Sequence, residues 1–124
     1  MGDAMARGDD IEDRLIDFAV RTIRACESLP DTPSARHIRG QLLRSGTSPA
    51  PNYAEARGAE SRRDFIHKLK IVLKELNESR VWLEIIVRGE LIQPELLTPL
   101  QDECDQLCRI IGRSIQTARN ADDH

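Results

Sequence analysis

The stretch that decides the fold runs from Ser61 to Gly89 and reads SRRDFIHKLKIVLKELNESRVWLEIIVRG. Residues suited to a buried face recur in it at alternating steps of four and three, which is typical of an amphipathic helix: Phe65, Leu69, Val72, Leu76, Ser79, Leu83 and Ile86. Ser61, with Asp64 three residues later, is expected to cap its amino end, and Gly89 to close it as a left-handed C-cap. About 27 residues at ~1.5 Å each predict a rod of roughly 40 Å.

This helix has more apolar surface than one buried stripe requires. Apolar residues widen the buried face on one side, and Ile71, Trp82 and Ile85 form a separate patch on the other. A helix of a small monomeric bundle usually needs a single apolar stripe of ~100° or a little more. We therefore expect Ile71, Trp82 and Ile85 to form an interface between copies of the chain, since a large exposed apolar patch favours association. The alternative is a loosely exposed Trp82 with its two neighbours.

Three further amphipathic segments flank this one. The first is expected over residues 10–29, with a second apolar side made by Ile16, Val20 and Ile23. The second is expected over residues 34–58, capped by Ser34 and kinked near Pro49 and Pro51, because a proline inside a helix costs ~3 kcal/mol. In that segment Ser48 is expected to act as a new N-cap that restarts the helix.

The last segment begins at Pro94, and its seam comprises Leu97, Leu100, Cys104, Leu107, Ile111 and Ala118. Four amphipathic helices with short connections predict an all-α, up-down-up-down four-helix bundle. We expect a flexible N-terminus at residues 1–9, the bundle domain at residues 10–119 and a flexible tail at residues 120–124.

Length and composition describe one domain with an aliphatic core. The chain has 124 residues, a net charge of −3 and only four aromatic residues. It contains no apolar run close to the ~20 residues of a membrane span, and its acidic amino end lacks the apolar segment of a secretory signal. We expect a cytoplasmic protein without a membrane partner. Cys26, Cys104 and Cys108 do not suggest a disulfide framework in this setting.

Positive charge is concentrated in the middle of the chain. Residues 34–74 contain nine basic and three acidic side chains, a local net charge of +6. Such a block can mark a phosphate-binding surface, and the predicted nucleic-acid-binding residues are Arg36, Arg39, Arg57, Arg62, Arg63, Lys70 and Lys74. The same block could instead be a solvated face that pairs with a neighbouring acidic helix.

No set of residues indicates catalysis or a cofactor. His37, His67 and His124 are widely spaced, and only Asp64 and His67 approach the Glu-x-x-His spacing of di-iron bundles. A polar group near the kink is expected to be structural, with carboxylates holding the kinked segment through charge-assisted bonds: Arg44, Asn52, Glu55, Glu75 and Glu78. A functional surface, or a ligand pocket at a subunit boundary around Glu75 and Glu78, stays open as an alternative.

The central sequence resembles a known bacterial family. Its pattern has Q-L-x-R-S, then S-x-x-x-N-x-x-E-A, D-F-x-x-K-L and E-L-x-E-S-x-x-W-L, and this chain matches it from Gln41 to Leu83. The family comprises the four-helix bundle proteins called 23S rRNA intervening-sequence proteins. It is similar in fold to the accessory variability determinant of diversity-generating retroelements, a basic pentameric barrel that binds nucleic acid and a reverse transcriptase. The resemblance covers about residues 11–118 and implies a homo-oligomer, with a pentamer as the expected ring.

These observations favour a non-enzymatic, homo-oligomeric bundle that binds nucleic acid, RNA in particular, through basic residues of the second and third helices. The competing hypothesis is a protein-interaction scaffold without a nucleic-acid role, which would present its apolar flank or acidic ends to a protein partner.

Overall fold

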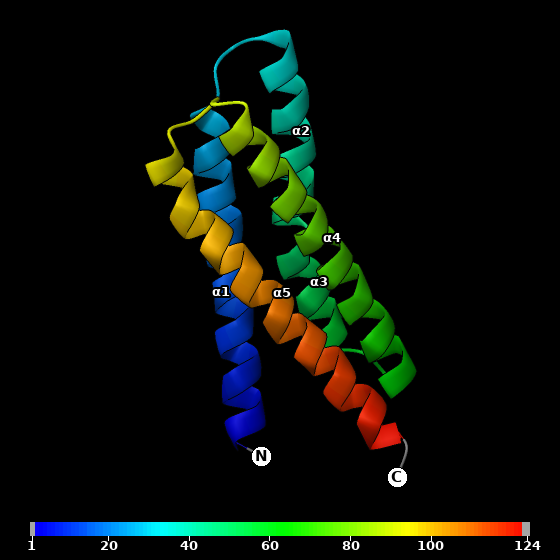
Figure 1. Cartoon of the computed structure of the whole chain (residues 1–124). Coiled ribbons are helices and arrows are strands. Elements are labelled where there is room, and N and C mark those ends of the chain that lie inside the picture. The colour runs from blue at the N-terminus through cyan, green and yellow to red at the C-terminus, as the bar shows by residue number, and fades with distance from the viewer. Residues whose placement is uncertain (1, 123–124) are drawn as a thin grey trace.

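The computed structural model describes residues 2–122, and side chains for residues 7–121. Its five helical segments, in chain order, are α1 (Gly2–Glu27), α2 (Pro33–Thr47), α3 (Pro49–Arg57), α4 (Arg62–Arg88) and α5 (Pro94–Asp122). The described chain contains no strand. Because α2 and α3 form one kinked rod, the molecule is an antiparallel bundle of four rods (Figure 1), and the predicted fold is confirmed. None of its helices combines the length and the apolarity needed to cross a bilayer, as far as the described residues extend.

The outer helices are longer than the sequence pattern suggests. Helix α1 begins at Gly2, eight residues before the expected start, and α5 continues to Asp122. The apolar pattern marks only the part of a helix that packs against its neighbours. The polar turns beyond that part stay helical, because no proline interrupts them. The first turns of α1 are also tied to α3, because Arg57 Nη2 lies 2.8 Å from Asp9 Oδ1. The ends of the two segments expected to be flexible, Met1 and residues 123–124, lie outside the described residues.

The cap of α2 lies two residues before the expected one. Thr32, not Ser34, has the extended backbone of an N-cap, and its Oγ1 accepts a hydrogen bond from the Ala35 amide at 3.2 Å. Pro33 then occupies the first helical position, where its fixed φ fits and its missing N–H is not needed. The prediction of Ser34 as the cap was therefore wrong, because a proline at the first turn makes the preceding residue the better cap.

The kink near Pro49 and Pro51 is confirmed, but its geometry differs from a restarted helix. Ser48 is itself helical, with φ −73° and ψ −35°, and its side chain makes no capping bond. Helical bonding continues through it, since Ser48 donates to the Arg44 carbonyl at 3.1 Å and accepts from the Asn52 amide at 3.2 Å. The helix loses only the two N–H groups that the prolines lack. Ser48 therefore holds the predicted position directly before the first residue of α3, but the predicted capping bond of its side chain is absent.

Both ends of α4 are closed by local hydrogen bonds. Ser61 is the predicted N-cap, and its Oγ accepts from the Asp64 amide at 3.1 Å. At the other end Gly89 has φ −79°, and the left-handed residue is Glu90, with φ 55°. Glu90 donates to the Val87 carbonyl and Leu91 to the Ile86 carbonyl, each at 3.1 Å, which is the Schellman pattern. The expected left-handed Gly89 was wrong by one residue.

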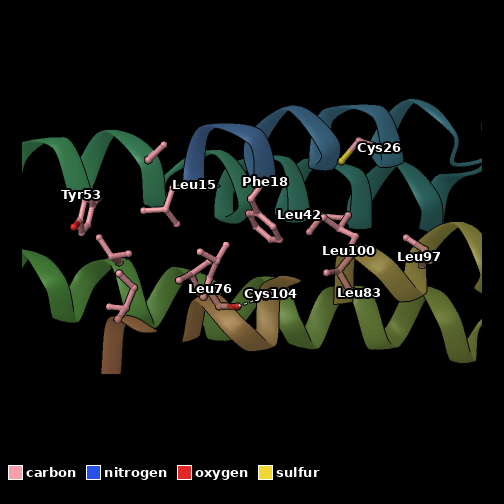
Figure 2. Packing of buried hydrophobic residues seen from close by; sticks show 14 of the residues in the cluster. Leu15, Phe18, Cys26, Leu42, Tyr53, Leu76, Leu83, Leu97, Leu100 and Cys104 are labelled. Carbon is pink, nitrogen blue, oxygen red and sulfur yellow. Dashed lines mark hydrogen bonds between the residues drawn. The ribbon is translucent and has the colours of Figure 1, made fainter. Parts of the chain in front are cut away.

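The core is an aliphatic layer shared by all helices (Figure 2). The predicted α4 seam is buried from Leu69 to Ile86, while Phe65 at its start is half-buried. Phe18 is fully buried, and Tyr53 and Leu97 lie at the two ends of the labelled cluster. The four rods are thus held by ordinary burial of Leu, Ile and Val, at about 25 cal/mol per Å² of apolar surface.

In this core, small residues allow the helices to approach closely. Ser79 Oγ of α4 donates to Ser45 Oγ of α2 at 2.8 Å. On the other side of α2, a Cβ added to Gly46 would lie 2.5 Å from Thr22 Cγ2 of α1. Helix α2 therefore packs against both neighbours through positions where a larger side chain would not fit.

Candidate nucleic-acid interface

The outer face of α4 carries three exposed cations that form no hydrogen bond or contact ion pair, although the charge of Lys74 acts on Glu78 one turn away. At 100° per residue Arg63, Lys70 and Lys74 fall on one side of the helix, opposite the buried seam, and all three are exposed. His67 lies among them on the same face and is also exposed. Within the described part of the chain, none of the three cations takes part in a hydrogen bond or a contact ion pair. This face can therefore meet an anion without first breaking an internal bond.

Two other predicted binding residues are occupied inside the molecule. Arg39 of α2 donates from Nε to the Cys26 carbonyl at 3.1 Å and from Nη2 to the Leu29 and Pro30 carbonyls at 3.1 and 3.2 Å. It thus satisfies carbonyl groups that the end of α1 leaves open. Arg57 of α3 reaches Asp9 and Glu12 of α1. Both side chains join helices.

The remaining two basic residues lie apart from this face. Arg36 of α2 is exposed, and its Nε lies 3.0 Å from Oδ1 of Asp31, which is also exposed. Such a pair is weak, at about 0–1 kcal/mol. Arg62 is the first residue of α4 and lines a groove at the end of the bundle. The seven predicted residues therefore do not form one surface.

The predicted polar group separates into three places. Arg44 of α2 bridges to α4, with Nη1 2.8 Å from Glu75 Oε2 and Nη2 bonded to Glu78. Asn52 Nδ2 donates to the Ser48 carbonyl at 3.0 Å and supports the kink. Glu55 of α3 pairs with Lys68 of α4 at 2.9 Å.

Trp82 completes the Arg44 bridge. Its Nε1 donates to Glu78 Oε2 at 3.1 Å, and its ring meets that of His37 edge to face with centroids 6.0 Å apart. The Arg44 guanidinium, and secondly the Trp82 N–H, hold the pKa of Glu78 below its usual value. Of the expected interface residues, Trp82 and Ile71 are half-buried within one chain, whereas Ile85 is 40% exposed.

Sequence reasoning missed several contacts that join the helices of the bundle. Arg14 of α1 forms a two-pronged bond to Glu103 of α5, at 3.0 and 2.6 Å, and no motif in the sequence marks this pair. A small residue facing a β-branched one, as at Gly46 and Thr22, is visible only once the two helices are placed. In the part of the chain that the structure describes, no three His, Cys, Asp or Glu side chains are grouped for a metal ion.

Comparison with known proteins gives a family and a structural relative. The family model described as 23S rRNA-intervening sequence protein matches residues 10–113. A crystal structure of a protein of unknown function from the S23 ribosomal protein family of Bacteroides thetaiotaomicron VPI-5482 is similar, with 36% sequence identity and a TM-score of 0.79. The match covers 85% of this chain and 97% of that chain. No curated protein matches the chain. With most of its length covered by the family model, the chain belongs to the 23S rRNA-intervening sequence protein family.

Proposed function

We propose that this chain is a non-enzymatic, homo-oligomeric helical bundle that binds RNA through the outer face of α4. The observation that carries the proposal is the row of exposed, unpaired cations formed by Arg63, Lys70 and Lys74. At ~1.5 Å per residue the row extends for roughly 16 Å along the helix. It offers the spaced positive charge that contacts a phosphate backbone.

The mechanism is phosphate contact with little reading of base sequence. The chain has four aromatic residues, and Phe65, Tyr53 and Phe18 belong to or border the core, so stacking of bases on this face has no obvious partner. Arginine and lysine contacts to phosphate release counterions and make the affinity depend on salt.

Self-association would repeat this face and raise its avidity. Ile85 is 40% exposed and Val81, one turn before it, 49% exposed. Ile71, Trp82 and Ile85 form the flank on which we place the contact between copies, and Val81 extends it toward the outer face. A pentamer is the expected assembly. Substituting Ile85→Glu should lower the light-scattering mass, whereas Ile16→Glu, at an isoleucine of α1 that is also exposed, should leave it unchanged. If both variants keep the wild-type mass, the contact lies elsewhere.

The experiment for RNA binding is a charge reversal with a matched control. Arg63→Glu, Lys70→Glu and Lys74→Glu together should weaken binding to a structured 23S rRNA fragment about a hundredfold or more, because electrostatic contacts supply most sequence-independent affinity. The control, Arg24→Glu, Arg109→Glu and Arg119→Glu, changes the net charge equally at exposed positions outside this face. Equal losses in both variants would reduce the effect to net charge and contradict the assigned surface.

A protein-interaction scaffold is the second candidate. It is favoured by the apolar stripe on α1, where Ile16, Val20 and Ile23 are 47, 38 and 39% exposed. This hypothesis predicts that a protein partner is lost when Val20 is replaced by Asp, while the mass of the assembly and the RNA affinity do not change.

A further inference from the structure

A groove of about 950 Å³ opens at the end of the bundle that holds both chain termini. Its lining residues come from the first half of α1, the last turns of α5, the start of α4 and the turn that joins α3 to α4, segments that lie together at this end of the bundle in Figure 1. Its volume is within the ~300–1,000 Å³ typical of small-molecule sites. The row of cations on the outer face of α4 does not line it.

Two arginine bridges hold the walls of this groove in place. Arg57 joins α3 to α1 through Asp9 at 2.8 Å and Glu12 at 3.2 Å. Gly8 makes room for it, because a Cβ there would lie 3.0 Å from Arg57 Nε. Arg14 joins α1 to α5 through its two bonds to Glu103. Charge-assisted bonds, and above all a bidentate pair such as Arg14–Glu103, fix geometry as well as adding energy, so the groove is preformed.

The floor of the groove is apolar. It is formed by Ile11 of α1, Ala56 of α3, Phe65 of α4 and Ile110 of α5, so each of the four rods contributes. Phe65 and Ile110 are only half-buried, although both pack against the core. An apolar body placed here would gain about 25 cal/mol for each Å² of apolar surface that it covers.

The rim carries positive charge that the fold does not use. Arg14 and Arg57 are neutralised by their bridges, but Arg7 and Arg113 have no hydrogen bond or ion pair within the described residues. Two carboxylates also line the groove, Asp10 and Glu60. The charge of Asp10 acts on the Arg14 guanidinium. Arg7 and Arg113 are the donors of the rim that a ligand can use. The amino end of α4 also reaches the groove at Ser61 and adds the partial positive charge of a helix terminus.

We propose that this groove binds a small amphipathic anion, with an apolar body on the floor and a carboxylate or phosphate head at Arg7 and Arg113. The site is independent of RNA binding on α4, since the residues of the two do not overlap. Recognition requires both parts: the floor supplies the burial, and the guanidinium groups select an anion over a neutral molecule of the same shape.

The test is calorimetric titration of the full chain with decanoate, decyl phosphate and decanol below their aggregation limits. Saturable binding of at least one anion is expected, with amide NMR shifts at Phe65, Ile110 and Ser114, together with at least tenfold weaker binding of decanol. The ratio of the two anion affinities identifies the head group. Binding of decanol as tight as that of the anions, or no saturable binding at all, would overturn the proposal.

Variants separate the two parts of the site. Arg7→Gln with Arg113→Gln should weaken anion binding at least tenfold, whereas Arg109→Gln with Arg119→Gln, which lie outside the groove, should not. Thr117→Trp fills the groove from an exposed position of α5 and should abolish binding without affecting the fold, as judged by circular dichroism. Unchanged binding in either groove variant, or cross-linking that shows a second copy seated in the groove, would contradict the assignment.

Discussion

Helix α4 presents two charged sides that differ in what their charges do. Toward α2, Glu75 and Glu78 are bonded to Arg44, and Trp82 donates a hydrogen bond to Glu78. On the outer face, Lys70 and Lys74 have no bonded partner among the described residues. The charges of the first side hold two helices together, whereas Lys70 and Lys74 on the second side form no such bond and are exposed. Net charge along the sequence does not reveal this difference, because it counts both kinds equally.

Two glycines of α2 differ sharply in how much space surrounds them. A Cβ added to Gly46 would clash with Thr22, while nothing lies within 4 Å of one added to Gly40. Gly46→Ala should therefore lower the free energy of unfolding by about 2 kcal/mol through overpacking. Gly40→Ala should raise it by about 1 kcal/mol through helix propensity. Urea unfolding of both variants checks this, and equal shifts of the same sign would mean that the α1–α2 contact is looser than described.

A substitution at the end of α4 should stabilise the fold. Glu90 has φ 55°, a conformation that disfavours residues with a side chain. Glu90→Gly should raise the free energy of unfolding by about 1 kcal/mol, because it removes the left-handed strain at the Schellman position. Thermal unfolding measures it, with Glu95→Gly in the first turn of α5 as a control that should be destabilising. A loss of stability in Glu90→Gly would contradict the assigned cap.

The Arg44 bridge should be visible as a small pH dependence. The pKa of Glu78 is lowered in the folded state, so its stabilising contribution is complete above the unfolded pKa of about 4.3 and is lost as the pH falls through the folded pKa. Because Glu78 is 32% exposed, we expect less than ~1 kcal/mol. Unfolding measured at pH 6 and pH 3 should show a smaller difference for Glu78→Gln than for the wild type. An identical difference would show that the bridge does not contribute.

The outer face should give the smallest effect on stability. Lys70→Gln and Lys74→Gln remove exposed charges without a bonded partner, and surface changes of this kind stay within about ±0.5 kcal/mol. Urea unfolding should therefore match the wild type. A loss of more than 1 kcal/mol would mean that these side chains support the fold, and the comparison between the two sides of α4 would fail.

The fold was predictable because it depends on periodic burial. The helix caps were harder to predict. The α4 seam and Ser61 follow from a repeated pattern and a local motif. Thr32 and Ser34 both suit an N-cap, however, and the choice depends on where Pro33 sits in the first turn. At the kink, Ser48 looks like a cap in sequence, but its backbone stays helical because only two amides are missing.

The candidate sites were predictable only in part, because their partners come from distant parts of the chain. Arg57 meets Glu12, 45 residues away, and Arg44 meets Glu78, 34 residues away. A block of positive charge gives no sign of which members are neutralised in this way. The groove depends on Arg7 and Arg113 lying at the same end of the bundle, which the topology decides and no local motif reveals.

The most direct test of the account is the salt dependence of RNA binding by the wild-type chain. Three phosphate contacts per subunit predict that log K falls linearly with log salt, with a slope of about −2 to −3 per subunit engaged. The charge-reversed α4 variant should lose both the affinity and the slope. An affinity for structured RNA that stays flat between low and moderate salt, or no binding at low salt, would contradict the proposal that the open face of α4 is a phosphate-binding surface.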